Sequence, residues 1–223
     1  MLKVVNKLRQ LPWITGLFGV VVLLLALLPE SLLSIVQYDR EKILDGELWR
    51  MFTGHLVHWN STHLVWDLLV FVACGGLLEW LRRNLLVSVL FGGSFVVSVA
   101  LLVFQPDMHT YRGLSALDMG LFSALCLQAI SYCWFRNKKS LAIIWSMVLL
   151  GCFLKPLLEV SLGSALFVSG FGPGVEASPE SHVYGILVAL ILFTGTSFWR
   201  KLSSRPGYNH KLRTHKLSET SIS

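Results

Sequence analysis

The sequence predicts an all-α membrane protein, a bundle of six transmembrane helices with both termini in the cytoplasm. The first observation behind this prediction is composition: the 223 residues are 54% hydrophobic and only 14% charged, and the mean hydropathy is +0.62. Soluble globular domains contain about 25% charged residues, so this chain is too apolar to be one. The other two observations are the long apolar segments and the uneven distribution of basic residues between the loops.

Six apolar segments can be marked along the chain, at residues 13–28, 63–80, 85–104, 115–134, 141–154 and 182–199. Most of them reach the roughly 17–25 residues that cross ~30 Å of hydrocarbon as a helix. The first and the fifth are shorter and would need flanking residues or a thinner bilayer. The first also has the basic start of a signal peptide, but it ends in Pro29-Glu30-Ser31 without a small-residue cleavage site, so we assign it to the bundle.

The basic residues mark the cytoplasmic side. Fourteen of the 19 lie on the N-terminus, the alternate short loops and the tail: Lys3, Lys7, Arg9, Arg82, Arg83, Arg136, Lys138, Lys139, Arg200, Lys201, Arg205, Lys211, Arg213 and Lys216. The opposite loops hold most of the acids, Glu159 among them. The positive-inside rule therefore places both termini in the cytoplasm, with a membrane domain at 1–199 and a basic cytoplasmic tail at 200–223. The net charge of +6 then reflects topology and contact with membrane lipids, and no nucleic-acid partner is expected.

Polar residues stand where three of the spans begin. Ser115 opens the fourth segment after Tyr111-Arg112-Gly113-Leu114, and His182 opens the sixth after Ser181. In the predicted topology even-numbered spans start at the outer face, so His63, Ser115 and His182 all enter the membrane from outside. A serine and a histidine arranged in this way are what an intramembrane nucleophile and its base require. A hydroxyl or an imidazole at a helix end is also ordinary, so position alone assigns no function.

Small residues repeat every four positions on two of the spans: Ala116, Gly120 and Ala124 on the fourth, and Ser181, Gly185 and Ala189 on the sixth. Such stripes permit close approach of helices in lipid. Each stripe starts beside a candidate residue, so packing the two stripes together would bring Ser115 and His182 within hydrogen-bonding range. Generic packing is the alternative, because these stripes are common in membrane helices.

Asp67 and Asp118 are acids within the predicted spans, each near the outer end of its span. Asp67 lies one helical turn after His63 on the same face, and Asp118 lies one turn after Ser115. An ionisable side chain in a span costs at least ~2.5–3.5 kcal/mol on insertion scales and normally faces the bundle interior. The two acids are therefore functional groups or structural groups that join helices by hydrogen bonds.

The sequence contains no motif for a metal or another cofactor. There is no H-E-x-x-H, and His55, His58 and His63 include no pair four residues apart. We expect His55 and His58 to hydrogen-bond loop backbone at the interface instead. There is also no phosphate-binding glycine motif, and the four cysteines, without a C-x-x-C, are expected to be buried apolar residues.

Four motifs in this order resemble those of the rhomboid family of intramembrane serine proteases. Trp49-Arg50 is similar to its W-R motif, His63-Leu64-Val65-Trp66-Asp67 to its H-x-x-x-N, Gly113-Leu114-Ser115-Ala116 to its G-x-S-G, and Ser181-His182-Val183-Tyr184-Gly185 to its A-H-x-x-G. The combination looks most like the rhombosortase branch, which is bacterial and associated with substrates bearing a C-terminal Gly-Gly, transmembrane and basic tail. The chain departs from the family pattern at Ala116, Asp67 and Ala189, where the family has glycine, asparagine and glycine.

The resemblance implies a rhomboid-like six-helix bundle in the bacterial inner membrane that cleaves membrane-anchored proteins near the outer face. Ser115 would be the nucleophile and His182 the base of a dyad, because the sequence offers no third residue to orient His182. The oxyanion would be held by the Ser115 backbone N–H and the His63 side chain, with Asp67 in support and no cofactor. The alternatives are a catalytically inactive membrane-protein binding factor, or a small transporter with a proton path through Asp67 and Asp118.

Two further expectations concern the surroundings of this site. Asp67 is expected to be neutral when the site is dry, so that its carboxyl can donate a hydrogen bond as an asparagine amide would. The rival hypothesis is an ionised Asp67 paired with a protonated His63. Residues 156–180 are rich in glycine and poor in charge, and they end just before His182, which predicts either a mobile cap over the site or a plain connector.

Overall fold

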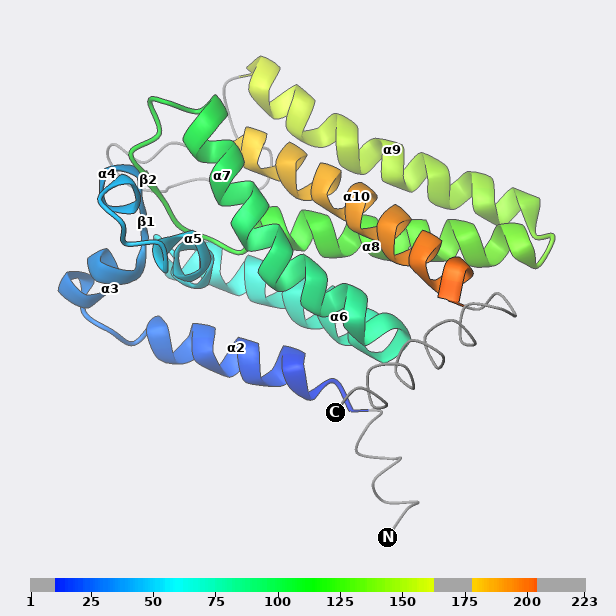
Figure 1. Cartoon of the computed structure of the whole chain (residues 1–223), viewed down its shortest axis with the longest axis horizontal. Coiled ribbons are helices and arrows are strands. Elements are labelled where there is room, and N and C mark those ends of the chain that lie inside the picture. The colour runs from blue at the N-terminus through cyan, green and yellow to red at the C-terminus, as the bar shows by residue number, and fades with distance from the viewer. Residues whose placement is uncertain (1–10, 163–177, 204–223) are drawn as a thin grey trace, which may run out of the picture.

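The computed structural model describes residues 11–162 and 178–203, most of them helical (Figure 1). The helices are α2 (Trp13–Leu25), α3 (Glu30–Val36), α4 (Arg40–Leu44), α5 (Arg50–Thr53), η1 (Gly54–Leu56), α6 (Ser61–Val87), η2 (Ser88–Gly93), α7 (Ser94–Phe104), α8 (Ser115–Phe135), α9 (Lys139–Leu162) and α10 (Pro179–Ser203). The helical character predicted from the sequence is confirmed. The structure adds one short antiparallel pair of strands, β1 (Tyr38–Asp39) and β2 (Thr110–Tyr111).

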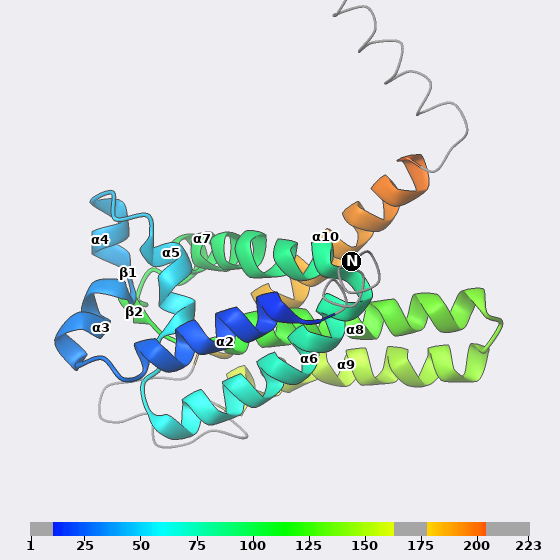
Figure 2. The ribbon, with the colours of Figure 1, turned by 90° about the horizontal axis from the view of Figure 1, so that it is seen from below.

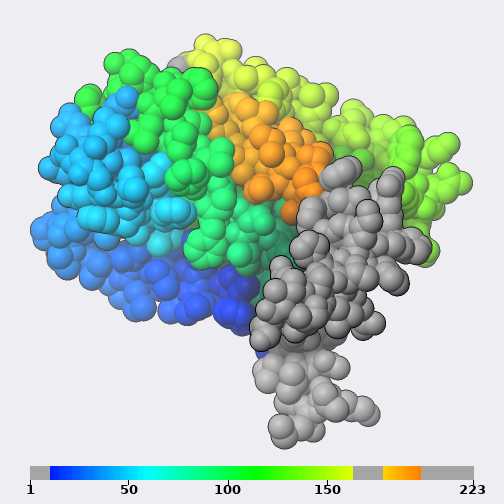
Figure 3. Space-filling model, in the orientation of Figure 1, coloured from blue at the N-terminus to red at the C-terminus, as the bar shows by residue number. Residues whose placement is uncertain are grey.

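Within residues 11–162 and 178–203, three helical stretches are long and apolar enough to cross a membrane: Ser61–Phe104, Ser115–Phe135 and Lys139–Leu162. The first of them contains both α6 and α7, which run in opposite directions, so it holds the second and third predicted segments (Figures 1 and 2). α2 is a shorter apolar helix. The surface of α10 lies between those of α7 and α9 (Figure 3). A total of six spans and cytoplasmic termini stay predictions.

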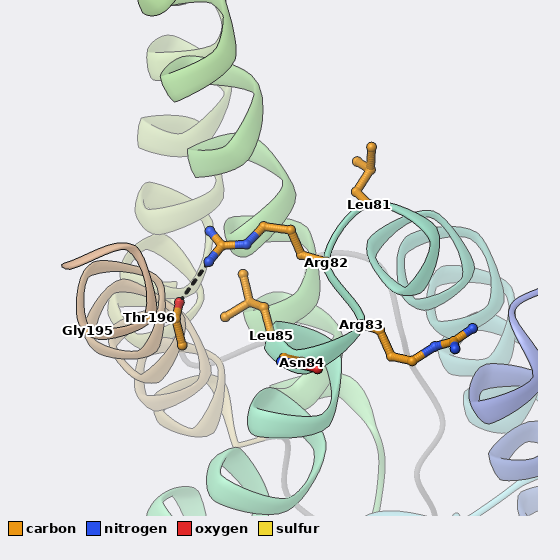
Figure 4. Close-up of a pocket in the computed structure, with 7 residues that line it drawn as sticks. All are labelled: Leu81, Arg82, Arg83, Asn84, Leu85, Gly195 and Thr196. Atoms are coloured by element: carbon orange, nitrogen blue, oxygen red, sulfur yellow. Dashed lines mark hydrogen bonds between the residues drawn. The ribbon is translucent and has the colours of Figure 1, made fainter. Parts of the chain in front are cut away.

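The chain reverses between α6 and α7 at Arg82, whose φ of −151° and ψ of 67° interrupt the helix. The helix then continues to Val87, and the π-helical η2 follows it. The Arg82 guanidinium donates a hydrogen bond to Thr196 of α10 at 3.0 Å (Figure 4). It donates another to Gln128 of α8 at 3.4 Å, which ties the reversal to both helices. Leu81–Leu85 and α10 together line a cavity of about 440 Å³ at this end of the bundle.

Glu79 of α6 holds the beginning of α2. Its carboxylate accepts hydrogen bonds from the backbone N–H groups of Ile14 at 3.1 Å and Thr15 at 2.8 Å, and from the Thr15 hydroxyl at 2.9 Å. The first N–H groups of a helix have no partner within the helix and carry partial positive charge, so a carboxylate stabilises them. α2 is thereby attached to α6, although it is three residues shorter than the predicted segment 13–28.

The fifth predicted segment, 141–154, is too short, because α9 runs on to Leu162. The expectation that a loop begins at residue 156 is therefore wrong. Pro156 lies inside the helix, where a proline removes one N–H donor and crowds the carbonyl four residues earlier. Membrane helices tolerate this because neighbouring groups can satisfy the freed backbone. The remainder of the expected cap, residues 163–177, lies outside the described residues.

α8 and α10 pack backbone against backbone near the starts of both helices. A methyl group on Gly185 would overlap the carbonyl oxygen of Ala116, and one on Gly120 would lie 3.1 Å from the carbonyl oxygen of Gly185. The two stripes of small residues therefore meet as the sequence predicts. Buried Leu117, Leu121 and Ala189 continue the same contact into the hydrophobic core.

We expect Gly185→Ala to lower the stability of the protein in detergent, because the added methyl group overlaps backbone that has no rotamer to move into. The loss should reach at least the ~1–3 kcal/mol that overpacking usually costs. Gly195→Ala on the same helix is the matched control, since nothing lies within 4 Å of its added methyl group. Helix propensity alone should make that control up to ~1 kcal/mol more stable. Equal melting temperatures for the two variants, measured by thermal unfolding, would contradict the close contact.

Candidate active site

Ser115 is the first residue of α8 and follows a turn that requires glycine. Gly113 has a φ of +130°, and a Cβ atom there would lie 2.6 Å from Cε1 and 2.7 Å from Nε2 of His63. The Gly113 N–H donates to the carbonyl of Gly54 at 3.3 Å, which connects the turn to η1. The turn presents the half-buried Ser115 at a helix N-terminus, where backbone N–H groups are available to stabilise negative charge.

Asp67 holds this turn from α6. Its Oδ2 atom accepts a hydrogen bond from the backbone N–H of Leu114 at 2.9 Å. The Nε2 atoms of His58 and His63 each lie 3.2 Å from the same oxygen. The structure thus joins His63 and Asp67 to the residue immediately before Ser115.

The geometry around Asp67 is that of a hydrogen-bond acceptor. A carboxylate accepts only, and its hydrogen bonds are strongest when the donors are charged. With a backbone N–H and two imidazole nitrogens directed at one oxygen, the arrangement favours an ionised Asp67 over the neutral, donating carboxyl that the sequence led us to expect. The rival hypothesis of an Asp67–His63 pair fits better, with His58 as a second partner.

The two histidines before α6 have different partners. His55 Nε2 lies 3.3 Å from the backbone carbonyl of Ser94 and 3.3 Å from the Ser98 hydroxyl, in the protein interior rather than at its surface. Burial lowers the pKa of His55 to about 4, so its ring is neutral at physiological pH. The expectation that His58 bonds loop backbone is wrong, because His58 is buried against Asp67.

Tyr111 lies where the starts of α8 and α10 meet. Its buried hydroxyl donates to the Gly113 carbonyl at 3.2 Å, and the phenol also interacts with the hydroxyls of Ser115 and Ser181. Burial raises the pKa of Tyr111 to about 12, so the phenol stays protonated and able to donate. Because β2 pairs with β1, with Tyr111 opposite Tyr38, the segment before α6 supports this position.

His182 lies in the first turn of α10, three residues before Gly185. The contact of Gly185 with Ala116 therefore places His182 and Ser115 on adjoining turns of the two helices. Within the described part of the chain these two side chains do not form a direct hydrogen bond. Catalytic hydrogen bonds are often long in free enzymes and shorten when substrate binds. The other ring nitrogen of His182, Nδ1, lies 3.5 Å from Oε2 of Glu159 on α9.

Sequence reasoning misses Glu159 and Tyr111 as members of the site. Ending the fifth segment at residue 154 leaves Glu159 among the outer-loop acids, whereas on α9 it is 1% exposed. The available signal is Lys155, because a lysine and a glutamate four residues apart share one face of a helix. Tyr111 carries no comparable signal, since its role depends on the pairing of two very short strands.

Asp118 is buried one turn below Ser115. The structural role considered above would require it to hydrogen-bond to another helix. Among the described residues neither of its carboxyl oxygens has a hydrogen-bond partner. The structure therefore gives no support, in that part of the chain, to a hydrogen bond from Asp118 that joins helices.

Two buried arginines organise the segment before α6, and one of them links it to the site. Arg50 donates to the backbone carbonyls of Ser34 at 2.8 Å and Gln37 at 3.0 Å. Arg112, which precedes Gly113, donates to the Gln37 side chain at 2.8 Å and pairs with the Glu30 carboxylate. Arg50 of the W-R motif is thus a structural residue here, and Arg112 links the same segment to the turn before Ser115.

Comparison with known proteins identifies one family. A model of the Rhomboid domain matches residues 45–197. The rhomboid protease GlpG of Haemophilus influenzae is 24% identical over 155 residues, which cover 66% of this chain and 76% of that protein. The matched range of the domain contains Ser115, His182, His63 and Asp67. Among the described residues no group of three His, Cys, Asp or Glu side chains is arranged to hold a metal ion.

We expect Asp67→Asn and Asp67→Ala to separate the charge of this residue from its hydrogen bond to Leu114. The amide oxygen of the introduced asparagine can still accept the Leu114 N–H, so the Asp67→Asn variant should keep its thermal stability. Asp67→Ala leaves a buried N–H unsatisfied, which should cost ~1–3 kcal/mol. If Asp67 is ionised, both variants should react slowly with a fluorophosphonate probe. A wild-type rate for Asp67→Asn at every pH would instead support a neutral carboxyl.

Proposed function

The chain belongs to the rhomboid family, and from this premise we propose that it is an intramembrane serine endopeptidase that cleaves membrane-anchored proteins by a Ser115–His182 dyad. One observation carries the proposal: the contact of Gly185 with Ala116, which sets the first turn of α10 against that of α8. A serine at a glycine-dependent turn and a histidine on the adjoining helix supply a nucleophile and a base in one place.

The proposed reaction has two steps. His182 takes the hydroxyl proton as Ser115 Oγ attacks the scissile carbonyl, and it then gives this proton to the leaving amine. A water molecule, deprotonated in the same way, hydrolyses the acyl-enzyme and releases Ser115. The positions of the two helices need not change between the steps, because one imidazole serves as base and acid in both.

The oxyanion that forms in each step would be stabilised by two donors. The backbone N–H of Ser115 lies at the N-terminus of α8, where the helix dipole favours negative charge. The His63 imidazole of α6 lies beside Gly113 of the turn before Ser115, and Asp67 fixes its orientation. Removing one such donor typically costs roughly 10²–10³ in kcat. The negative charge of Asp67 is offset by its hydrogen-bonded partners, which limits its repulsion of the oxyanion.

The location of the enzyme follows from the distribution of charge. With 14 of the 19 basic residues on one set of segments, we place both termini and the tail at 200–223 in the cytoplasm, and Ser115 and His182 near the outer face. The resemblance to a bacterial branch adds the inner membrane as the compartment. Membrane lipids and a transmembrane protein substrate are then the partners of the protein.

The alternatives fit the site less well. A proton path through Asp67 needs a side chain free to change partners, whereas Asp67 is held by Leu114 and lies against two histidines. A binding factor without activity has no need for both Ser115 and His182.

Ser115→Ala and His182→Ala should each abolish reaction with a fluorophosphonate probe and cleavage of a transmembrane reporter. The expected loss is on the order of 10⁶ for either residue, as in serine proteases where the two act as a unit. Ser123→Ala, a buried serine two turns further along α8, is the control and should react like the wild type. Strong labelling of the Ser115→Ala protein would overturn the assignment of the nucleophile.

The substrate class rests on the resemblance to the rhombosortase branch. We propose that the preferred substrate is an exported protein with a C-terminal Gly-Gly, an apolar span and a basic tail. Co-expression of such a protein should release its tail, and Ser115→Ala should prevent this release, as followed by mass spectrometry of the substrate C-terminus. Equal processing after the Gly-Gly is changed to Leu-Leu would point to a broader specificity.

A further inference from the structure

We propose that Glu159 of α9 is a positioning residue for His182, so that the site works as a Ser115–His182–Glu159 triad with Lys155 holding the carboxylate. This inference rests on the proposed serine protease function and adds a residue that the sequence does not reveal. Glu159 would act through the imidazole rather than on the substrate.

The first support is the direction of the contact. Glu159 Oε2 lies 3.5 Å from His182 Nδ1, and the Glu159 side chain is 2% exposed while that of His182 is 18% exposed. Among the described residues His182 Nδ1 has no hydrogen-bond partner, so the carboxylate is the group that faces this nitrogen. The distance is longer than a directed hydrogen bond, so the contact is that of a negative charge facing the ring nitrogen.

The second support is the chemistry of the two ring nitrogens. If Nε2 is to accept the Ser115 proton, the neutral ring must carry its proton on Nδ1. A carboxylate beside Nδ1 selects this tautomer and stabilises the imidazolium that forms when Nε2 is protonated. The proton of Ser115 then moves to Nε2 and on to the leaving amine, while the Nδ1 proton stays on the ring and Glu159 takes none.

The third support is the way that Glu159 is held. Lys155 Nζ donates to Oε1 at 2.8 Å and to Oε2 at 2.9 Å, one helical turn before Glu159. This pair fixes the carboxylate and offsets much of its charge, which makes an acid tolerable in an apolar helix. A lysine and a glutamate that only strengthened α9 could lie on its outward face, yet the Glu159 carboxylate is turned inward to α10.

The elements that pack against α10 carry other buried titratable groups, Asp118 on α8 and His63 and Asp67 on α6. Tyr111 of β2 interacts with Ser181, the residue before His182. η2 and α7, which also contact α10, contain no titratable residue. Among these groups, Glu159 is the acid for which the described structure gives a contact with His182.

Two single variants distinguish a positioning role from a purely structural ion pair. Both Glu159→Gln and Lys155→Gln break the same pair, so a structural role predicts similar effects from both. A positioning role predicts opposite ones. Glu159→Gln removes the negative charge that favours protonated His182. Labelling of Ser115 by a fluorophosphonate probe should therefore slow by about 10- to 10³-fold, and the acid limb of its pH–rate profile should move to lower pH. Lys155→Gln keeps the carboxylate and removes the positive charge beside it, so labelling should persist and the acid limb of the pH profile should move to higher pH.

The readout is the rate of Ser115 modification by a fluorophosphonate probe in detergent, measured across the pH range in which histidine titrates. Glu159→Asp, which retains the charge one methylene further back, should recover part of the rate. The Lys155→Gln/Glu159→Gln double variant buries no unpaired charge, and it should fold and react as slowly as Glu159→Gln. Glu180→Gln is the matched control for charge, because it removes a negative charge two residues before His182. Residues two apart on a helix do not face each other, so this variant should leave the pH profile unchanged.

The outcomes separate this inference from the function on which it rests. If the wild-type protein does not react with the probe, the proposed function fails. If the wild type reacts and Glu159→Gln has the same rate and pH profile, the function stands and the triad is wrong. Parallel slowing by Glu159→Gln and Lys155→Gln, with no change in either acid limb, also overturns the triad and leaves Glu159 as a structural residue.

Discussion

The backbone contact between Gly185 and Ala116 is the constraint on which the site depends. In lipid, helices gain nothing from burying apolar surface against each other, so their association rests on close packing and hydrogen bonds. A contact without side chains fixes the separation of α8 and α10 more tightly than interlocking leucines would, because backbone atoms have no alternative rotamers. The relative positions of Ser115 and His182 follow from this contact, since each lies within one turn of it.

The turn before Ser115 depends in the same way on residues that are distant in sequence. Gly54 accepts the Gly113 N–H, Asp67 accepts the Leu114 N–H, and Tyr111 donates to the Gly113 carbonyl. Each of the two side chains is itself anchored, Asp67 by two histidines and Tyr111 by the β1–β2 pair. The segment between α2 and α6 is therefore part of the scaffold that orients the nucleophile, and a change there can affect Ser115 without touching it.

Local periodicity predicted the parts of this arrangement that are repetitive. The stripes of small residues identify the α8–α10 contact, and the break between segments 63–80 and 85–104 falls at the reversal at Arg82. Pairings between single residues leave no such pattern. His58 and Asp67 meet because the chain turns between them, and nothing in the spacing distinguishes that pair from His55 and Asp67. Glu159 escapes notice because a lysine, a proline and a glutamate end a hydropathy segment, whereas the helix continues through all three.

The placement of buried acids gives the strongest reason to regard Glu159 as functional. Glu79 accepts the free N–H groups of α2, and Asp67 accepts that of Leu114, so each satisfies backbone that would otherwise be unpaired in the membrane. The Glu159 carboxylate accepts from the ammonium of Lys155 and lies beside the imidazole of His182. A buried ion pair is usually no more stabilising than an apolar pair of the same size. A leucine and a methionine on α9 would therefore serve stability as well, but they could not place a negative charge beside His182 Nδ1.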